Sequence, residues 1–148
     1  MVTLCYELSP EWNRDQPGLD LSLAGEVALR YDLFLGDVVF TIDGADLSAR
    51  WGWVPVLDFA LSLRFALRSL ERDGTASLEF TESDERILIE RSGDALRLTA
   101  TYAPFAAATV ARAELEEAAD RFLERLVDDL CARHPELGVN PVFTALLA

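Results

Sequence analysis

The side chains that most often carry enzymatic chemistry are scarce in this chain. His134 is its only histidine and stands directly before Pro135. A cationic side chain is typical of the last turn of a helix, so the sequence favours a structural role for His134. Cys5 and Cys131 stand near opposite ends of the chain, without the spacing of a metal or redox motif. We therefore predict no catalytic residue, and no histidine-based metal site, because such a site needs several ligands.

Carboxylates are plentiful, but they do not form a known motif. The acidic loops at residues 43–46 and 82–85 are the best candidates for a hard cation. Neither loop has the acids at alternate positions, followed by a distant Glu, that an EF-hand requires. The chain also lacks a glycine-rich phosphate-binding loop and a Gly-x-Ser-x-Gly nucleophile turn. We expect no metal ion and no cofactor, and we favour a function other than catalysis.

Acidic side chains recur at every fourth position in the second of two predicted helices. Four residues make about one helical turn, so these side chains form a row along the helix. We call this row the acidic ridge, and its members are Glu116, Asp120, Glu124 and Asp128. Like charges at this spacing cost an isolated helix about 0.2–0.5 kcal/mol per pair. The acidic ridge therefore requires an explanation.

Three interpretations of the acidic ridge are open. It is a solvated helix face in the simplest one. If the two predicted helices lie side by side, Arg64, Arg68 and Arg72 could face part of the ridge and neutralise it within the fold. In the functional interpretation, the ridge receives a basic partner protein and steers its approach.

The composition limits the classes of partner. Twenty-six acidic and thirteen basic residues give a formal net charge of −13 over 148 residues. This charge disfavours binding to nucleic acid or to an anionic membrane, where basic patches supply most of the affinity. Apolar residues make up 51% of the chain, which argues against disorder. No signal peptide or membrane span is recognisable, so we expect a cytoplasmic protein that binds neither nucleic acid nor a membrane.

Two long helices are the first of the predicted elements that position these residues. The first is predicted at residues 54–72, with Pro55 in its first turn and Gly74 as its stop. The second is predicted at residues 113–134 from an apolar stripe at helical spacing, and it ends before Pro135. Asn140 as an N-cap predicts a short C-terminal helix after it.

Strand patterns fill the rest of the chain. Alternating side chains at residues 26–35 predict a strand that forms a hairpin with residues 38–42. Residues 76–102 predict a three-stranded meander, and residues 105–110 fit either a further strand or a loop. Short connections between consecutive strands favour an antiparallel sheet of about 5–7 strands under the helices. The predicted fold is a two-layer α+β sandwich, with residues 1–148 forming one domain.

Four side chains near the start of the first helix could line a pocket between helix and sheet: Tyr31, Trp51, Trp53 and Asp58. Such a pocket would indicate a small-molecule-binding domain or an enzyme without a familiar motif. The simpler interpretation has both tryptophans closing the bottom of the core, as is usual for large aromatic side chains. A third interpretation makes them a recognition loop, because tryptophan is enriched at interface hot spots.

A second apolar stripe on the first helix also requires a cover. It consists of Leu57, Leu61 and Phe65, and it could form the interface of a homodimer. Among these alternatives, we favour an acidic cytoplasmic module that occupies a basic surface of a partner protein. Immunity proteins and antitoxins are often of this general type, which is an analogy of character and not of residues.

Overall fold

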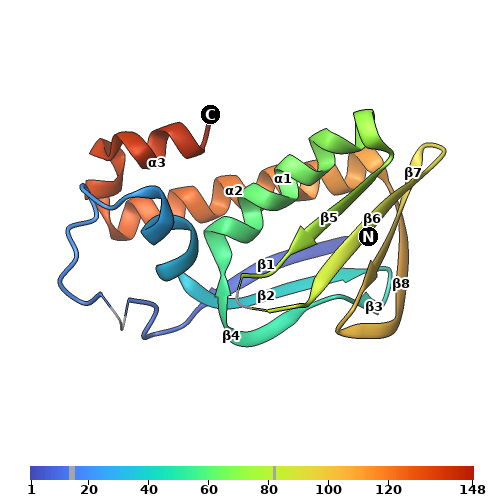
Figure 1. Cartoon of the computed structure of the whole chain (residues 1–148), viewed down its shortest axis with the longest axis horizontal. Helices are drawn as coiled ribbons and strands as arrows, with labels where there is room; N and C mark the ends of the chain where they lie inside the picture. The colour runs from blue at the N-terminus through green and yellow to red at the C-terminus, as the bar shows by residue number, and fades with distance from the viewer. Residues whose placement is uncertain (14–15, 82) are drawn as a thin grey trace.

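The computed structural model describes residues 1–13, 16–81 and 83–148. In these residues, eight strands form two antiparallel sheets of four strands each. Two long helices lie side by side along one side of the sheets (Figure 1). The predicted α+β class, with mainly antiparallel strands, two long helices and a short C-terminal helix, is confirmed. The strands are more numerous than expected and are divided between two sheets.

The first sheet is arranged around β2 (Leu35–Ile42), which pairs with every other strand of this sheet. Its partners are β1 (Val2–Leu8), β3 (Ala45–Asp46) and β4 (Ala49–Pro55). β1 and β2 pass very close to each other at Gly36, where a Cβ atom would collide with the backbone of the opposite strand. No strand was predicted at residues 49–55, but as β4 they continue the sheet directly into the first helix.

The second sheet is a meander with strand order β5-β6-β7-β8. Its strands are β5 (Thr75–Glu79), β6 (Arg86–Ser92), β7 (Ala95–Ala100) and β8 (Ala103–Ala111). The predicted meander is confirmed. The segment at residues 105–110 belongs to a strand, because β8 pairs with β7 along most of its length.

The helix ends follow the local capping chemistry. α1 (Val56–Asp73) ends at Gly74, whose φ of 75° lies in the left-handed region that glycine tolerates. α2 (Arg112–Arg133) is followed by a short 3₁₀-helix, η2 (Pro135–Val139). Asn140 then caps α3 (Pro141–Leu146), since its Oδ1 accepts hydrogen bonds from the backbone N–H groups of Val142 and Phe143. All three predicted helices therefore exist, with boundaries shifted by one or two residues.

The strand predicted at residues 26–35 is wrong. Most of this segment is helical and contains the π-helical turn η1 (Ala28–Asp32), which packs against α1. Leu29 and Leu33 are fully buried, whereas Val27 and Tyr31 are 65% and 37% exposed. The buried positions are therefore four residues apart, as in a helix. Alternating apolar residues over a short segment fit both periods, and only the packing against α1 decides between them.

Phe59 connects the layers of the core. Its ring lies 6.5 Å from Phe40 of the first sheet, 6.0 Å from Phe80 after β5, and 5.9 Å from Phe122 of α2. These are ordinary distances for aromatic pairs, which add to the stabilisation from buried apolar area. The start of α1 is thus fixed against both sheets and against α2, and this positions the side chains on its outer face.

Candidate functional site

The acidic ridge of α2 is largely exposed. Asp120, Glu124 and Asp128 are exposed, and none of them forms an ion pair with a residue that the structure describes. Glu116 differs, because its Oε1 accepts a hydrogen bond from Nε of Arg112 at 2.7 Å. Three of the four predicted ridge carboxylates are therefore exposed and without an ion pair to a described residue.

The arginines of α1 were a possible source of neutralisation for the acidic ridge. Among the described residues, they form no ion pairs with it. α1 and α2 do lie side by side, and Arg64 and Arg68 share a cavity of about 240 Å³ with Glu116 and Asp120. The guanidinium of Arg64, however, donates to the backbone carbonyl oxygens at the end of α3. Arg72 pairs with its neighbour Asp73 at 3.3 Å.

The C-terminal half of the ridge borders a shallow hollow between α2 and β1. It is lined by three carboxylates, two arginines and a tyrosine: Glu124, Asp128, Asp129, Arg121, Arg125 and Tyr6. The Tyr6 hydroxyl donates a 2.6 Å hydrogen bond to Oδ2 of Asp129, and burial and this carboxylate raise the pKa of Tyr6. Tyr6 therefore remains neutral at physiological pH, and the hollow combines three carboxylates with two arginines.

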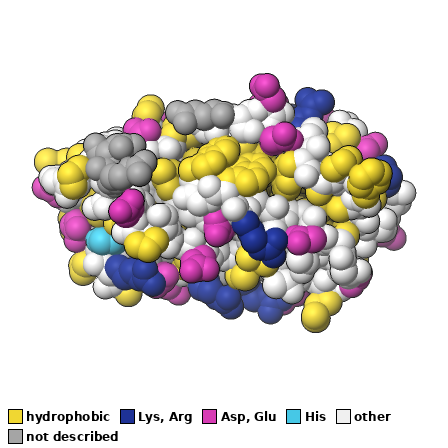
Figure 2. Space-filling model, turned by 90° about the horizontal axis from the view of Figure 1, so that it is seen from below, with side chains coloured by type: hydrophobic (Ala, Val, Ile, Leu, Met, Phe, Trp, Pro, Cys, Tyr) yellow, Lys and Arg dark blue, Asp and Glu magenta, His cyan; other side chains and the backbone are white. Residues whose placement is uncertain are grey.

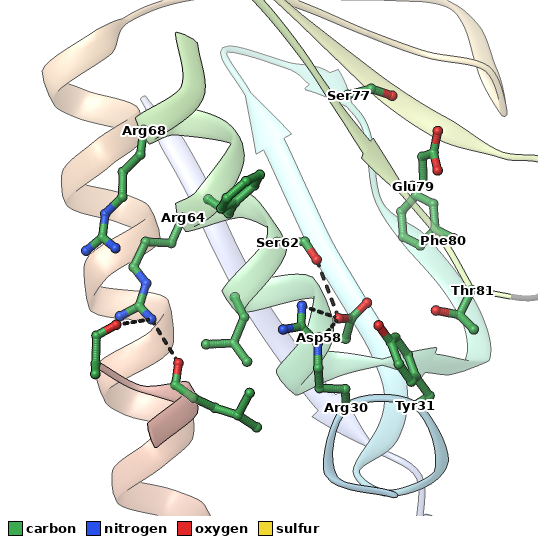
Figure 3. A pocket seen from close by; sticks show the side chains of 14 residues that line it. Arg30, Tyr31, Asp58, Ser62, Arg64, Arg68, Ser77, Glu79, Phe80 and Thr81 are labelled. Carbon is green, nitrogen blue, oxygen red and sulfur yellow. Dashed lines mark hydrogen bonds and ion pairs between the residues drawn. The ribbon is translucent and has the colours of Figure 1, made fainter. Parts of the chain in front are cut away.

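A second candidate site lies over the outer face of α1. This α1 pocket has a volume of about 650 Å³ and is bordered by η1, α1, the end of β5 and the C-terminal residues (Figure 3). Its lining includes two residues of the predicted pocket, Tyr31 and Asp58. Neither Trp51 nor Trp53 is among the described residues that line it.

The start of the α1 pocket is organised by a buried ion pair. Asp58 is only 7% exposed, and its Oδ1 accepts a hydrogen bond from Nε of Arg30 at 2.7 Å. Ser62, one turn along α1, lies at 3.5 Å from the same oxygen. Burial raises the pKa of Asp58, whereas the hydrogen bonds and charge of Arg30 act in the opposite direction. Sequence reasoning missed Arg30 because it placed this residue in a strand; the helical spacing of Leu29 and Leu33 was the available signal.

The two tryptophans lie together on β4, and Trp51 packs against the core. Their rings stack at 5.1 Å, and Trp51 also contacts Phe80 and Tyr102 edge-on. Trp53, the outer member of the stack, is 40% exposed. Figure 2, which shows the side of the molecule where β4 lies in Figure 1, has a group of hydrophobic side chains near its centre. The tryptophans therefore do not line the α1 pocket, although Trp51 contacts Phe80, which does.

The predicted dimer face does not form a continuous exposed stripe. Leu57 is fully buried and Leu61 is 5% exposed, whereas Phe65 is 70% exposed. The core and the partly buried C-terminal residues cover the first two side chains within a single chain. Of these three side chains, only Phe65 is exposed enough to contact a second chain, and it lines the α1 pocket.

The described residues of the acidic loops do not gather into a metal site. In the described part of the chain, no group of three or more His, Cys, Asp or Glu side chains could hold a metal ion. Asp46 accepts a hydrogen bond from the backbone N–H of Ser48, while Glu82 of the other loop lies outside the described residues. Among the described helices, none has the length and apolar character needed to cross a membrane. No family model, curated protein or solved structure matches this chain.

Proposed function

We propose that this protein is an acidic cytoplasmic binding module that occupies a basic surface of a partner protein, as immunity proteins and antitoxins do. The observation that carries the proposal is a row of exposed carboxylates on α2, Asp120, Glu124 and Asp128, which form no ion pair with a described residue. We keep the name acidic ridge for the four predicted residues and call these three the open ridge.

The geometry of the open ridge suits recognition of a basic surface. The helix rises about 1.5 Å per residue, so neighbouring carboxylates of the ridge are about 6 Å apart along α2. A rigid helix holds this spacing without the loss of backbone entropy that a flexible acidic loop would suffer. Unpaired surface charges also raise the association rate with an oppositely charged partner.

The proposal is tested with two variants that lose the same number of charges. D120N/E124Q/D128N removes the open ridge, and D84N/E90Q/D94N removes three carboxylates from the second sheet and its turns. Each immobilised variant is exposed to lysate of the native host, and the retained basic proteins are identified and then purified for titration. We expect the first variant to weaken binding of a purified partner by about 10-fold or more, because charge pairs at interfaces contribute strongly.

The control variant is expected to bind like the wild type. Equal losses in both variants would show attraction to net charge alone and would contradict a specific site on α2. Unchanged binding by D120N/E124Q/D128N would also contradict it. Measurements at two salt concentrations add a further check, since screening weakens contacts between exposed charges.

A further inference from the structure

Two arginines beside the α1 pocket form no ion pair with any described Asp or Glu side chain. Arg64 and Arg68 project from consecutive turns of α1 toward the same side (Figure 3). Arg64 donates hydrogen bonds to the carbonyl oxygens of Leu146 and Leu147, both at 3.1 Å, and its Nη2 lies 3.5 Å from an oxygen of Ala148. Carbonyl oxygens are neutral, so they orient the guanidinium without cancelling its charge. Arg68 is exposed and forms no ion pair with any residue that the structure describes.

This arrangement is unusual for a chain with twice as many acids as bases. Like charges one helical turn apart repel each other. Partial burial and the neighbouring Arg68 lower the pKa of Arg64, and only Asp120 acts in the opposite direction from a distance. Arg30, the third arginine of the pocket, is already paired with Asp58. A bound anion would relieve the repulsion between Arg64 and Arg68.

We propose that the α1 pocket binds a small organic anion, with its phosphate or carboxylate group held between Arg64 and Arg68. Guanidinium groups are well suited to both, because their fixed N–H donors match the oxygens of either group. Glu79 lies on the opposite side of the pocket, and its carboxylate disfavours an anion there (Figure 3). The charges within the pocket therefore set the direction in which the ligand lies.

The rest of the pocket indicates a ligand with an apolar body. Phe65 is 70% exposed in the lining, and Leu61 and Phe80 also belong to it. The hydroxyl groups of Ser62 and Thr81 supply polar contacts farther from the arginines. A volume of about 650 Å³ lies within the range of small-molecule sites. An aromatic phosphate or carboxylate satisfies these features better than an inorganic ion does.

The backbone beside the pocket is also unusual. η1 is π-helical, a form that occurs frequently at functional sites. Phe34, two residues after η1, is fully buried with a φ of 56°, a conformation that costs energy for a bulky side chain. These two features position Arg30 and Tyr31 at the end of the pocket. The surrounding fold thus maintains a strained segment at this site.

The test uses phenyl phosphate, benzoate and inorganic phosphate as probes, titrated into the full-length protein at constant ionic strength. Backbone amide chemical shifts report where each probe binds. We expect shifts at residues 61–68 and 77–81, with phenyl phosphate binding more tightly than inorganic phosphate. R68Q should weaken the binding of phenyl phosphate by about 10- to 100-fold, which is the range for loss of a hydrogen bond to a charged group. R72Q is the matched control, because Arg72 lies one turn farther along α1 and does not line the pocket.

A second variant separates the apolar contact from the charge. F65S should weaken the binding of phenyl phosphate by at least about fivefold, because apolar burial is lost, and leave the binding of inorganic phosphate unchanged. Because Arg68 and Phe65 are exposed, neither change is expected to unfold the protein, which circular dichroism checks. Absence of shifts in the pocket at millimolar concentrations of all three probes would overturn the proposal. Equal weakening by R68Q and R72Q would overturn it as well. These variants change no residue of the open ridge, and the readout here is small-anion binding and not partner binding, so a failure of this proposal is distinguishable from a failure of the proposed function.

Discussion

Asp58 combines burial with a nearby positive charge, and the two affect its protonation in opposite directions. Among the described acidic residues it is the only buried one. Both Nε and Nη2 of Arg30 lie 2.7 Å from its Oδ1. The pKa of Asp58 is nevertheless raised above the ordinary value of 3.8, because loss of hydration is the larger effect. The pair therefore positions η1 over α1 at some cost in stability at neutral pH.

This balance predicts a pH dependence of stability that D58N removes. In the window above pH 3.8, the folded protein binds more protons at this site than the unfolded chain does. The contribution of Asp58 to the free energy of unfolding is thus fully present below that window and falls as the pH rises through the raised pKa. Urea denaturation from pH 3 to 7 measures this: the stability of the wild type relative to D58N should decrease with pH.

D20N supplies a control of opposite sign. Hydrogen bonds from Ser22 lower the pKa of the exposed Asp20, so its contribution is present above pH 3.8 and lost as the pH falls through the lowered pKa. If the stability of the wild type relative to D58N increased with pH instead, the charge of Arg30 would outweigh burial, and the assignment for Asp58 would be wrong.

At the scale of elements, the close contact between β1 and β2 depends on Gly36. A Cβ atom at this position would collide with the backbone of Glu7 and Leu8. G36A is expected to destabilise the fold by about 1–3 kcal/mol, as overpacking of a tight site does. Gly25 is a matched control, since a Cβ atom added there would meet no atom within 4 Å and its φ is not positive. Urea denaturation of both variants checks this, and a G36A protein as stable as G25A would contradict the close packing.

The same elements show why some structure could be predicted from the sequence and some could not. Gly74 and Asn140 end or begin helices through contacts with their immediate neighbours, so their roles follow from local chemistry. The row on α2 was predictable for the same reason, because helical spacing fixes its geometry. Residues 26–35 were misassigned because their conformation depends on packing against α1. The contact of Arg30 with Asp58 spans 28 residues and depends on that same packing.

Burial posed a similar problem for the predicted dimer face. Leu57, Leu61 and Phe65 follow one helical stripe, but the core covers the first two and leaves the third exposed. Tyr31 and Asp58 line the same pocket, whereas the tryptophans belong to the unpredicted strand β4 and do not line it. Helical or strand spacing indicates which residues share a face, but only the assembled layers determine what covers it.

Across the whole molecule, the acidic surplus is unevenly distributed. The open ridge lies on α2, whereas three arginines line the α1 pocket. The two proposed sites therefore differ in the sign of the charge that they attract. A net charge of −13 also opposes the compact state through mutual repulsion. Salt should relieve this repulsion, because its screening length is about 10 Å at 0.1 M.

This repulsion predicts that the melting temperature rises with salt. A screening gain of about 1 kcal/mol raises Tm by about 2–4 °C for a chain of this size. Differential scanning calorimetry in low and in near-physiological NaCl measures the effect. Because the open-ridge carboxylates repel one another at one-turn spacing, D120N/E124Q/D128N should melt higher than the wild type at low salt and gain less from added salt. D84N/E90Q/D94N loses the same number of charges without that spacing, so it should gain less stability at low salt. A Tm that does not respond to salt, or equal responses in the two variants, would show that repulsion along α2 contributes little.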